Sequence, residues 1–397
     1  MPSLANRINN LSESQTIAMA RKSRELKAQG IDIINLSLGE PDFDTPQIIK
    51  DAAKQAIDEN FSHYTDVSGY LELRESISKK FKRDNHLDYS AEQIVVSTGA
   101  KQSIANVILA MINPGDEVIV PAPYWVSYIE LIKLAEGLPV IIKAGIEQDF
   151  KVTPTQLKSA ITTKTKMIIF STPCNPTGSV YSRDELKAIA EIVAEFPELY
   201  ILSDEIYEHI NFARGHESIA QFDFIKDQVI TINGVSKSFA MTGWRVGFMG
   251  APVWIAKACD KLQGQITSNT SSISQKATQS AMEMNPQTTQ PMRDEFKKRR
   301  DLALDIMRQI PGLKTNTPQG AFYIFPDVTY YFGKSDSMTV INNGTDLCSY
   351  LLDKARVALV PGSAFGDDNY VRLSYATSQD KLTEALRRIK KALADLK

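Results

Sequence analysis

The hydrophobic and polar positions of the chain repeat in alternating units from about residue 93 to residue 249. Short apolar runs predict strands at 93–96, 117–120, 139–142, 167–170, 200–202, 229–232 and 246–249. Longer stretches with apolar residues at helical spacing predict helices at 103–112, 127–134, 154–160 and 183–195. Such alternation favours an α/β fold whose mostly parallel, seven-stranded sheet is covered on both faces. We expect functional groups at the carboxyl ends of these strands.

The regions on either side of this repeat have a different pattern. Before it, the spacing predicts helices at 14–29, 47–59 and 71–85, a strand at 31–38, and an irregular loop at 39–46 that is rich in helix and strand breakers. After it, the spacing predicts helices at 294–309, 345–355 and 380–396, a strand pair signalled by 320–325, and strands at 357–360 and 370–375. We therefore expect a large domain at 46–290 and a smaller α+β domain built from both termini, 1–45 and 291–397. The loop 39–46 would cross between them.

Composition and charge narrow the class of protein. The chain has 397 residues, 43% of them hydrophobic and 23% charged, with a net charge of −2, and its acidic and basic residues are interspersed. This predicts a soluble two-domain protein with no nucleic-acid partner and no membrane surface. The three cysteines are scattered, which favours a reducing cytoplasm, and the four histidines lack metal-ligand spacing, so we expect no metal site.

The strongest chemical signal is Lys237, which follows the apolar run 229–232 in the sequence GVSKSFAMTGWRVG. Small neighbours let a bulky group approach the lysine, and partial burial would lower its pKa toward that of a usable amine. Arg245 lies eight positions further on. An amine beside a fixed cation suggests a Schiff base with a phosphate-bearing carbonyl compound. An ordinary lysine at the end of a strand is the alternative.

Three other strand ends carry candidate groups. Gly99 and Ala100 lie between a strand and a helix, where free N–H groups and the helix dipole favour a phosphate, although such turns are common. Trp125 is suited to stack on a flat ring or to fill the core. Asn175 lies in the rigid sequence PCNPTG, which favours a held amide over a solvent-facing one.

Asp204 and Arg372 are charged residues in apolar surroundings. Asp204 ends a buried run and needs a partner, either as a helix cap or for a protonated ring nitrogen, with the hydroxyl of Tyr207 three residues later. Arg372 lies within an apolar strand, where it would bind a carboxylate bidentately or form an internal salt bridge. Together with Lys237 and Ser236, these residues meet the needs of pyridoxal phosphate and an amino-acid substrate.

On these motifs the chain resembles the class I aminotransferases, with the pyridoxal-phosphate aspartate-aminotransferase fold, over essentially its whole length. The resemblance implies that Lys237 is the Schiff-base lysine and proton shuttle, that Asp204 binds the pyridine nitrogen, and that Asn175 and Tyr207 bind the ring 3-oxygen. It implies a cofactor site made of Tyr64, Gly99, Ala100, Lys101, Trp125, Asn175, Asp204, Tyr207, Ser236, Lys237 and Arg245. It also implies a homodimer, in which Tyr64 and the segment 265–272 complete the site of the partner subunit.

The segment 36–46, LSLGEPDFDTP, resembles the bacterial branch of aspartate aminotransferases. In that branch a lysine and a threonine recognise the distal carboxylate of the substrate, and Lys101 and Thr16 match them. The substrate site would contain Thr16, Gly39, Lys101, Trp125, Asn175 and Arg372. The implied reaction is transamination from aspartate to 2-oxoglutarate, which gives oxaloacetate and glutamate.

Several alternatives stay open on the sequence. Relatives of this branch also transaminate prephenate, and Thr16 with Lys101 would serve that dicarboxylate too. Aromatic or alanine specificity is disfavoured, because Lys101 would then lack a carboxylate to bind. A lyase or decarboxylase on the same fold, or a ligand-sensing regulator, is a more distant alternative, since a fold does not fix the reaction.

Overall fold

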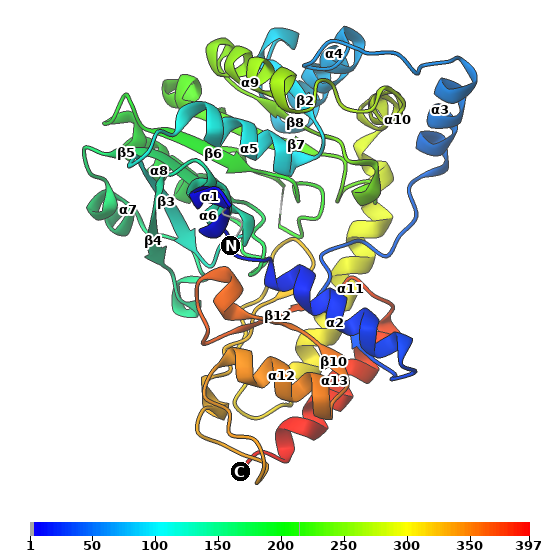
Figure 1. Ribbon diagram of the computed structural model, residues 1–397, viewed down its shortest axis with the longest axis vertical. Coiled ribbons are helices and arrows are strands. Elements are labelled where there is room, and N and C mark those ends of the chain that lie inside the picture. Colours follow the sequence, from blue (N-terminus) through cyan, green and yellow to red (C-terminus); the bar gives the residue numbers. More distant parts are fainter. Residues whose placement is uncertain (1–3, 214) are drawn as a thin grey trace.

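The computed structural model describes residues 4–213 and 215–397. Its centre is a seven-stranded sheet with the strand order β2-β8-β7-β6-β5-β3-β4 (Figure 1). The strands are β2 (Ile94–Ser97), β3 (Glu117–Ala122), β4 (Leu138–Lys143), β5 (Thr165–Ser171), β6 (Tyr200–Asp204), β7 (Val229–Gly234) and β8 (Gly247–Gly250). Only β8 runs antiparallel to its neighbours. The mostly parallel seven-stranded sheet predicted from the sequence is confirmed.

Alternate residues of the inner strands enter two separate hydrophobic clusters. In β2, Ile94 and Val96 pack into one cluster, while Val95 packs into the other. Because successive side chains of a strand point to opposite faces, each face needs its own cover of helices. The helices of this part are α3 (Gln47–Asp58), α4 (Leu71–Lys80), α5 (Ala100–Met111), α6 (Ser127–Leu134), α7 (Pro154–Ala160), α8 (Arg183–Ala194), α9 (Val253–Ile266) and α10 (Ser272–Glu283).

A further core is formed mainly by the C-terminal part of the chain. Its elements are α11 (Gln290–Met307), α12 (Gly344–Lys354), α13 (Gln379–Ala394) and the strands β9 (Tyr323–Ile324), β10 (Val357–Ala358), β11 (Val360–Pro361) and β12 (Val371–Ser374). The N-terminal segment joins it through Leu36, while Ile49 already belongs to a core of the central sheet. The loop 39–46 therefore runs between two cores. The boundaries 46–290, 1–45 and 291–397 stay a prediction.

Some predicted elements differ in extent from those in the structure. The strand predicted at 31–38 is paired only at β1 (Ile34–Asn35), and the helix predicted at 71–85 ends as a π-helical turn, Phe81–Asn85, closed by His86 with φ of 58°. The strand predicted at 357–360 divides, because β10 pairs with β1 whereas β11 pairs with β12. An uninterrupted apolar run could not reveal that its ends join different sheets.

Helix α2 (Gln15–Ala28) packs on the C-terminal core beside β10 and β11, and the short α1 (Asn6–Asn9) lies against α6 (Figure 1). The N-terminal segment thus contacts both halves of the molecule on one side. Among the described helices, none is long and apolar enough to cross a membrane.

Candidate active site

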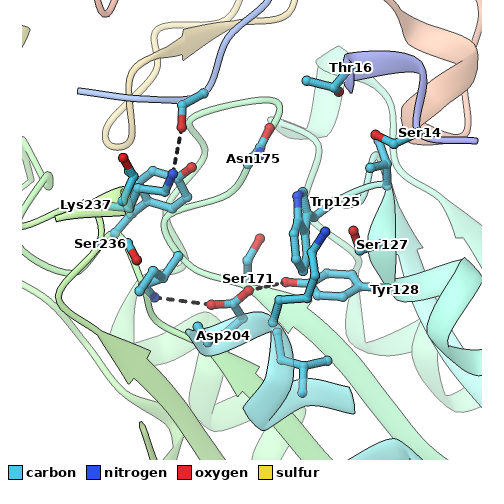
Figure 2. Close-up of a pocket in the computed structure, with 18 of the residues that line it drawn as sticks. Ser14, Thr16, Trp125, Ser127, Tyr128, Ser171, Asn175, Asp204, Ser236 and Lys237 are labelled. Atoms are coloured by element: carbon cyan, nitrogen blue, oxygen red, sulfur yellow. Dashed lines mark hydrogen bonds between the residues drawn. The ribbon is translucent and has the colours of Figure 1, made fainter. Parts of the chain in front are cut away.

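A cavity of about 310 Å³ opens at the carboxyl edge of the central sheet (Figure 2). The parallel strands β3, β5, β6 and β7 each end at this edge, which brings the loops that follow them together. All the predicted site residues except Gly99 and Tyr64 line the cavity: Thr16, Gly39, Ala100, Lys101, Trp125, Asn175, Asp204, Tyr207, Ser236, Lys237, Arg245 and Arg372. Positions up to 356 residues apart in the sequence therefore meet in one space.

Lys237 lies in the turn after β7 and points into the cavity (Figure 2). Its Nζ donates a hydrogen bond to the carbonyl oxygen of Gly39 at 2.6 Å. Burial lowers the pKa of Lys237 to about 8, and the cations Arg372 and Arg245 act in the same direction. About a tenth of the amine is therefore neutral at pH 7, far more than for an ordinary lysine, and the neutral form is the nucleophile.

Asp204, the last residue of β6, forms the floor of the cavity. Its Oδ2 accepts a hydrogen bond from the hydroxyl of Tyr128 at 2.7 Å, and Oδ1 accepts one from the backbone N–H of Ile206 at 3.3 Å. Burial raises the pKa of this carboxyl to about 6. Both hydrogen-bond partners are neutral, so the buried carboxylate still lacks the full counter-charge that would compensate its desolvation.

The N-terminus of α5 forms one wall of the cavity. Gly99, its N-cap residue, has φ of 85°, and no side chain caps the helix. A Cβ at Gly99 would overlap the guanidinium of Arg245, so only glycine lets the cation lie this close to the helix end. Ser236 and Ala100 line the adjacent surface. A helix N-terminus beside an arginine is an anion site, which matches the predicted phosphate position.

Arg372 in β12 is 2% exposed. Its Nη1 donates to Oδ1 of Asn175 at 2.9 Å and its Nη2 to the carbonyl oxygen of Ser37 at 2.6 Å. Nε has no hydrogen-bond partner among the described residues. The structure thus pairs Arg372 with neutral oxygens rather than in the salt bridge that the sequence left open, and burial lowers its pKa. A buried guanidinium of this kind is suited to an added carboxylate.

Lys101, Thr16 and Trp125 also line the cavity, and Lys101 is exposed. The Nζ of Lys101 lies 5.0 Å from the ring centroid of Trp125, while the lysine stays accessible to solvent. Desolvation in the cavity and the charge of Arg245 lower the pKa of Lys101. Thr16 lies in the first turn of α2 at the edge of the cavity (Figure 2). The cavity lining thus includes an exposed cation and a hydroxyl.

Two predicted contributions lie outside this cavity. Tyr64 is 91% exposed, and the segment 265–272 contributes no residue to the cavity lining. Within its own chain, this segment packs beside the start of α5, where Thr267 accepts a hydrogen bond from Gln102 and Thr270 from Thr98. A role for Tyr64 therefore requires a second copy of the chain.

Several lining residues carry no sequence-based prediction: Ser14, Ile17, Ile104, Val126, Ser127, Tyr128, Ser171, Ile206, Thr242 and Tyr323. The sequence does carry a signal for Tyr128, because it lies three positions after Trp125 at the start of a predicted helix. In the structure, the two rings meet edge to face at 5.4 Å. Tyr323 has none, since β9 reaches the cavity only through its pairing with β12.

The fold is that of the aspartate aminotransferases, and its cavity brings together a lysine, a buried carboxylate and a buried arginine. Residues 31–389 match the family "Aminotransferase class I and II", and the chain belongs to that family. It is therefore a transaminase.

Several similar proteins are named as aspartate or aspartate/prephenate aminotransferases. A bifunctional aspartate aminotransferase and glutamate/aspartate-prephenate aminotransferase of Petunia hybrida is 48% identical, over 100% of this chain and 84% of its own length. An aspartate/prephenate aminotransferase of Nitrosomonas europaea is 44% identical, over 98% and 100%. The aspartate aminotransferase of Rhizobium meliloti superposes with a TM-score of 0.97 at 40% identity, over the whole of both chains. That of Thermus thermophilus, solved with maleate, gives 0.92 at 37% identity over 99% and 100%.

Proposed function

We propose that the chain is a pyridoxal-phosphate-dependent aspartate aminotransferase. The observation that carries this is the charge of the cavity: its lining holds the cations Lys101, Lys237, Arg245 and Arg372, and Asp204 is its one carboxylate among the described residues. Besides the reactive amine of Lys237, three cations match three anionic groups. These are a phosphate at Arg245, an α-carboxylate at Arg372 and a distal carboxylate at Lys101.

The residues fit pyridoxal phosphate. Lys237 has an amine with a pKa of about 8, Asp204 is a buried carboxylate without a cationic hydrogen-bond partner, and Gly99 leaves room at an uncapped helix end. Lys237 would hold the cofactor covalently, Asp204 would bind its ring nitrogen, and Arg245, Ser236 and Ala100 its phosphate. The bound cofactor supplies an electron sink for electrons withdrawn from the substrate Cα.

The chain's own residues would orient the substrate and move its proton. Arg372 and Gly39 would hold the α-carboxylate, Trp125 would stack on the ring, and Asn175 and Tyr207 would bind the ring 3-oxygen. The Nζ of Lys237 would accept the proton from the substrate Cα and deliver it to C4′ of the cofactor. Thr16 and Lys101 would select a dicarboxylate.

Formation of oxaloacetate from aspartate and 2-oxoglutarate by the purified holoenzyme tests this proposal. We expect turnover with this pair, and no turnover with any acidic amino donor would contradict it. Prephenate is the second acceptor to test, because the Petunia hybrida and Nitrosomonas europaea relatives carry it in their names. The ratio of kcat/KM for oxaloacetate and prephenate separates the two substrates.

Lys101→Ala is expected to lose acidic substrates selectively. A charge-assisted hydrogen bond contributes about 1.5–3 kcal/mol, so kcat/KM for aspartate should fall about 10- to 100-fold. The value for alanine, which has no distal carboxylate, should change little. Lys297→Ala, at an exposed position of α11, is the control. Equal losses for alanine and aspartate would remove Lys101 from substrate recognition.

We also propose that the enzyme works as a homodimer in which Tyr64 and the segment 265–272 complete the partner's site. Tyr64→Ala should weaken cofactor binding about 10- to 100-fold through loss of a hydrogen bond to phosphate. Mixed dimers of two variants test the sharing of Tyr64 directly. In a dimer of one Lys237→Ala protomer and one Tyr64→Ala protomer, the Tyr64→Ala protomer keeps its Lys237 and receives Tyr64 from its partner, so one site is complete. The mixture should therefore be more active than either variant alone. Activity that merely averages the two variants would place Tyr64 outside the shared site.

A further inference from the structure

The hydroxyl groups of Tyr207 and Tyr323 form a buried pair beside the cavity. Their oxygens are 2.8 Å apart, and either can be the donor. Tyr207 is 3% exposed and Tyr323 1% exposed, and their rings meet edge to face at 5.9 Å. Tyr207 follows β6 of the central sheet, whereas Tyr323 begins β9 of the C-terminal core. The pair thus joins the two parts of the molecule at the site.

The number of protons fixes what this pair can do. Each phenol carries one proton, so Tyr207 can donate to a ligand oxygen only when Tyr323 is the donor in their shared hydrogen bond and Tyr207 accepts. Tyr323 is the hydroxyl within hydrogen-bond distance of Tyr207 in the described residues, and Tyr207 is its hydrogen-bond partner there. A proton on Tyr323 that points to Tyr207 therefore leaves the Tyr207 proton free to point into the cavity.

The position of Tyr323 is itself fixed from three sides. Its strand pairs with β12, where Ser374 is its register partner, and the guanidinium carbon of Arg372 lies 4.5 Å from its ring centroid. The chain at Gly39 approaches so closely that a Cβ there would overlap the Tyr323 hydroxyl. Tyr323 therefore lies against both residues proposed to hold the α-carboxylate, with little freedom to leave Tyr207.

We infer that Tyr323 is a positioning residue whose hydroxyl directs the proton of Tyr207 toward the ring 3-oxygen of pyridoxal phosphate. This inference rests on the proposed function. The charged groups that face the pair are Arg372 from β12, Lys237 from the turn after β7, and Asp204 from β6. None of them changes in a phenylalanine variant, so Tyr323→Phe isolates the effect of one hydroxyl while keeping the ring under Arg372.

The test is a pH titration of the visible absorbance of the bound cofactor in wild type, Tyr323→Phe, Tyr207→Phe and the double variant. A hydrogen bond to the ring oxygen favours its anionic form, so losing that bond raises the titration midpoint. We expect a rise of about one pH unit for Tyr207→Phe and a smaller rise for Tyr323→Phe. The double variant should equal Tyr207→Phe, because Tyr323 acts only through Tyr207. Tyr375→Phe, which removes a buried hydroxyl bonded to the carbonyl of Ala321, is the control and should not shift.

The outcomes are distinct. A wild-type protein that binds no pyridoxal phosphate would overturn the proposed function itself. A wild-type midpoint in Tyr323→Phe, an additive shift in the double variant, or an equal shift in Tyr375→Phe would each overturn the role of Tyr323. If Tyr323→Phe does not fold, NMR of wild-type protein labelled at the tyrosine Cζ decides. The Tyr207 and Tyr323 signals should both move when pyridoxal phosphate binds, and an unmoved Tyr323 signal would overturn the inference.

Discussion

Lys237→Ala is expected to abolish transamination, with kcat lowered by at least about 10³-fold. General acid–base catalysis alone contributes about 10²- to 10⁴-fold, and the same amine is proposed to hold the cofactor. Its environment supports both tasks, because burial lowers its pKa to about 8 and its Nζ already points into the cavity. Steady-state rates with aspartate and 2-oxoglutarate measure the loss.

Two measurements show whether the loss has the proposed cause. After borohydride reduction, mass spectrometry should find the cofactor on the peptide that contains Lys237, and on no peptide of the variant. In wild-type apoprotein, the rate of cofactor capture should rise with pH and level off above about 8, since the neutral amine is the nucleophile. Lys297→Ala is the matched control at an exposed site. A Lys237→Ala protein with wild-type turnover would refute the assignment.

Much of the site was predictable because it follows from the order of the strands. Asp204 ends β6, and Asn175 follows β5, while Lys237 follows β7. Neighbouring parallel strands carry their carboxyl ends to one edge, so a local pattern of apolar runs suffices to place these three side chains together. The residue types then indicate the chemistry, since an isolated buried carboxylate and a lysine among small residues have few other uses.

The residues that were not predicted depend on packing between distant segments. Tyr323 reaches the cavity through a two-residue strand, and its pairing with β12 leaves no periodic signal. Helix α10 was missed for a related reason. It buries the polar residues Ser272, Gln275 and Thr278, so its inward face does not show as an apolar stripe. Gln275 instead bonds to Thr65 and to the backbone of Thr270, which only the folded chain brings near.

Asp204→Asn is expected to separate stability from catalysis. Burial raises the pKa of this carboxyl from its ordinary value of 3.8 to about 6, so the folded apoprotein disfavours the charged form. The Asp204 carboxyl therefore costs the folded apoprotein roughly 3 kcal/mol at pH 8, and this cost disappears as pH falls from about 6 to about 4. The variant should be as stable as wild type or more stable at pH 8, and thermal unfolding of the apoprotein across this pH range measures the difference.

The holoenzyme should behave in the opposite way, because a protonated ring nitrogen would give Asp204 the cation it lacks. Removing one partner of a buried ion pair costs about 3–5 kcal/mol, so kcat/KM should fall about 10²- to 10⁴-fold and cofactor affinity should fall with it. Glu205→Gln is the matched control. Its carboxylate is buried one residue away but bonds to His216 and Ser218 instead of lining the cavity. That variant should lose stability and keep the cofactor, so a shared pattern in both variants would show that Asp204 acts only through folding.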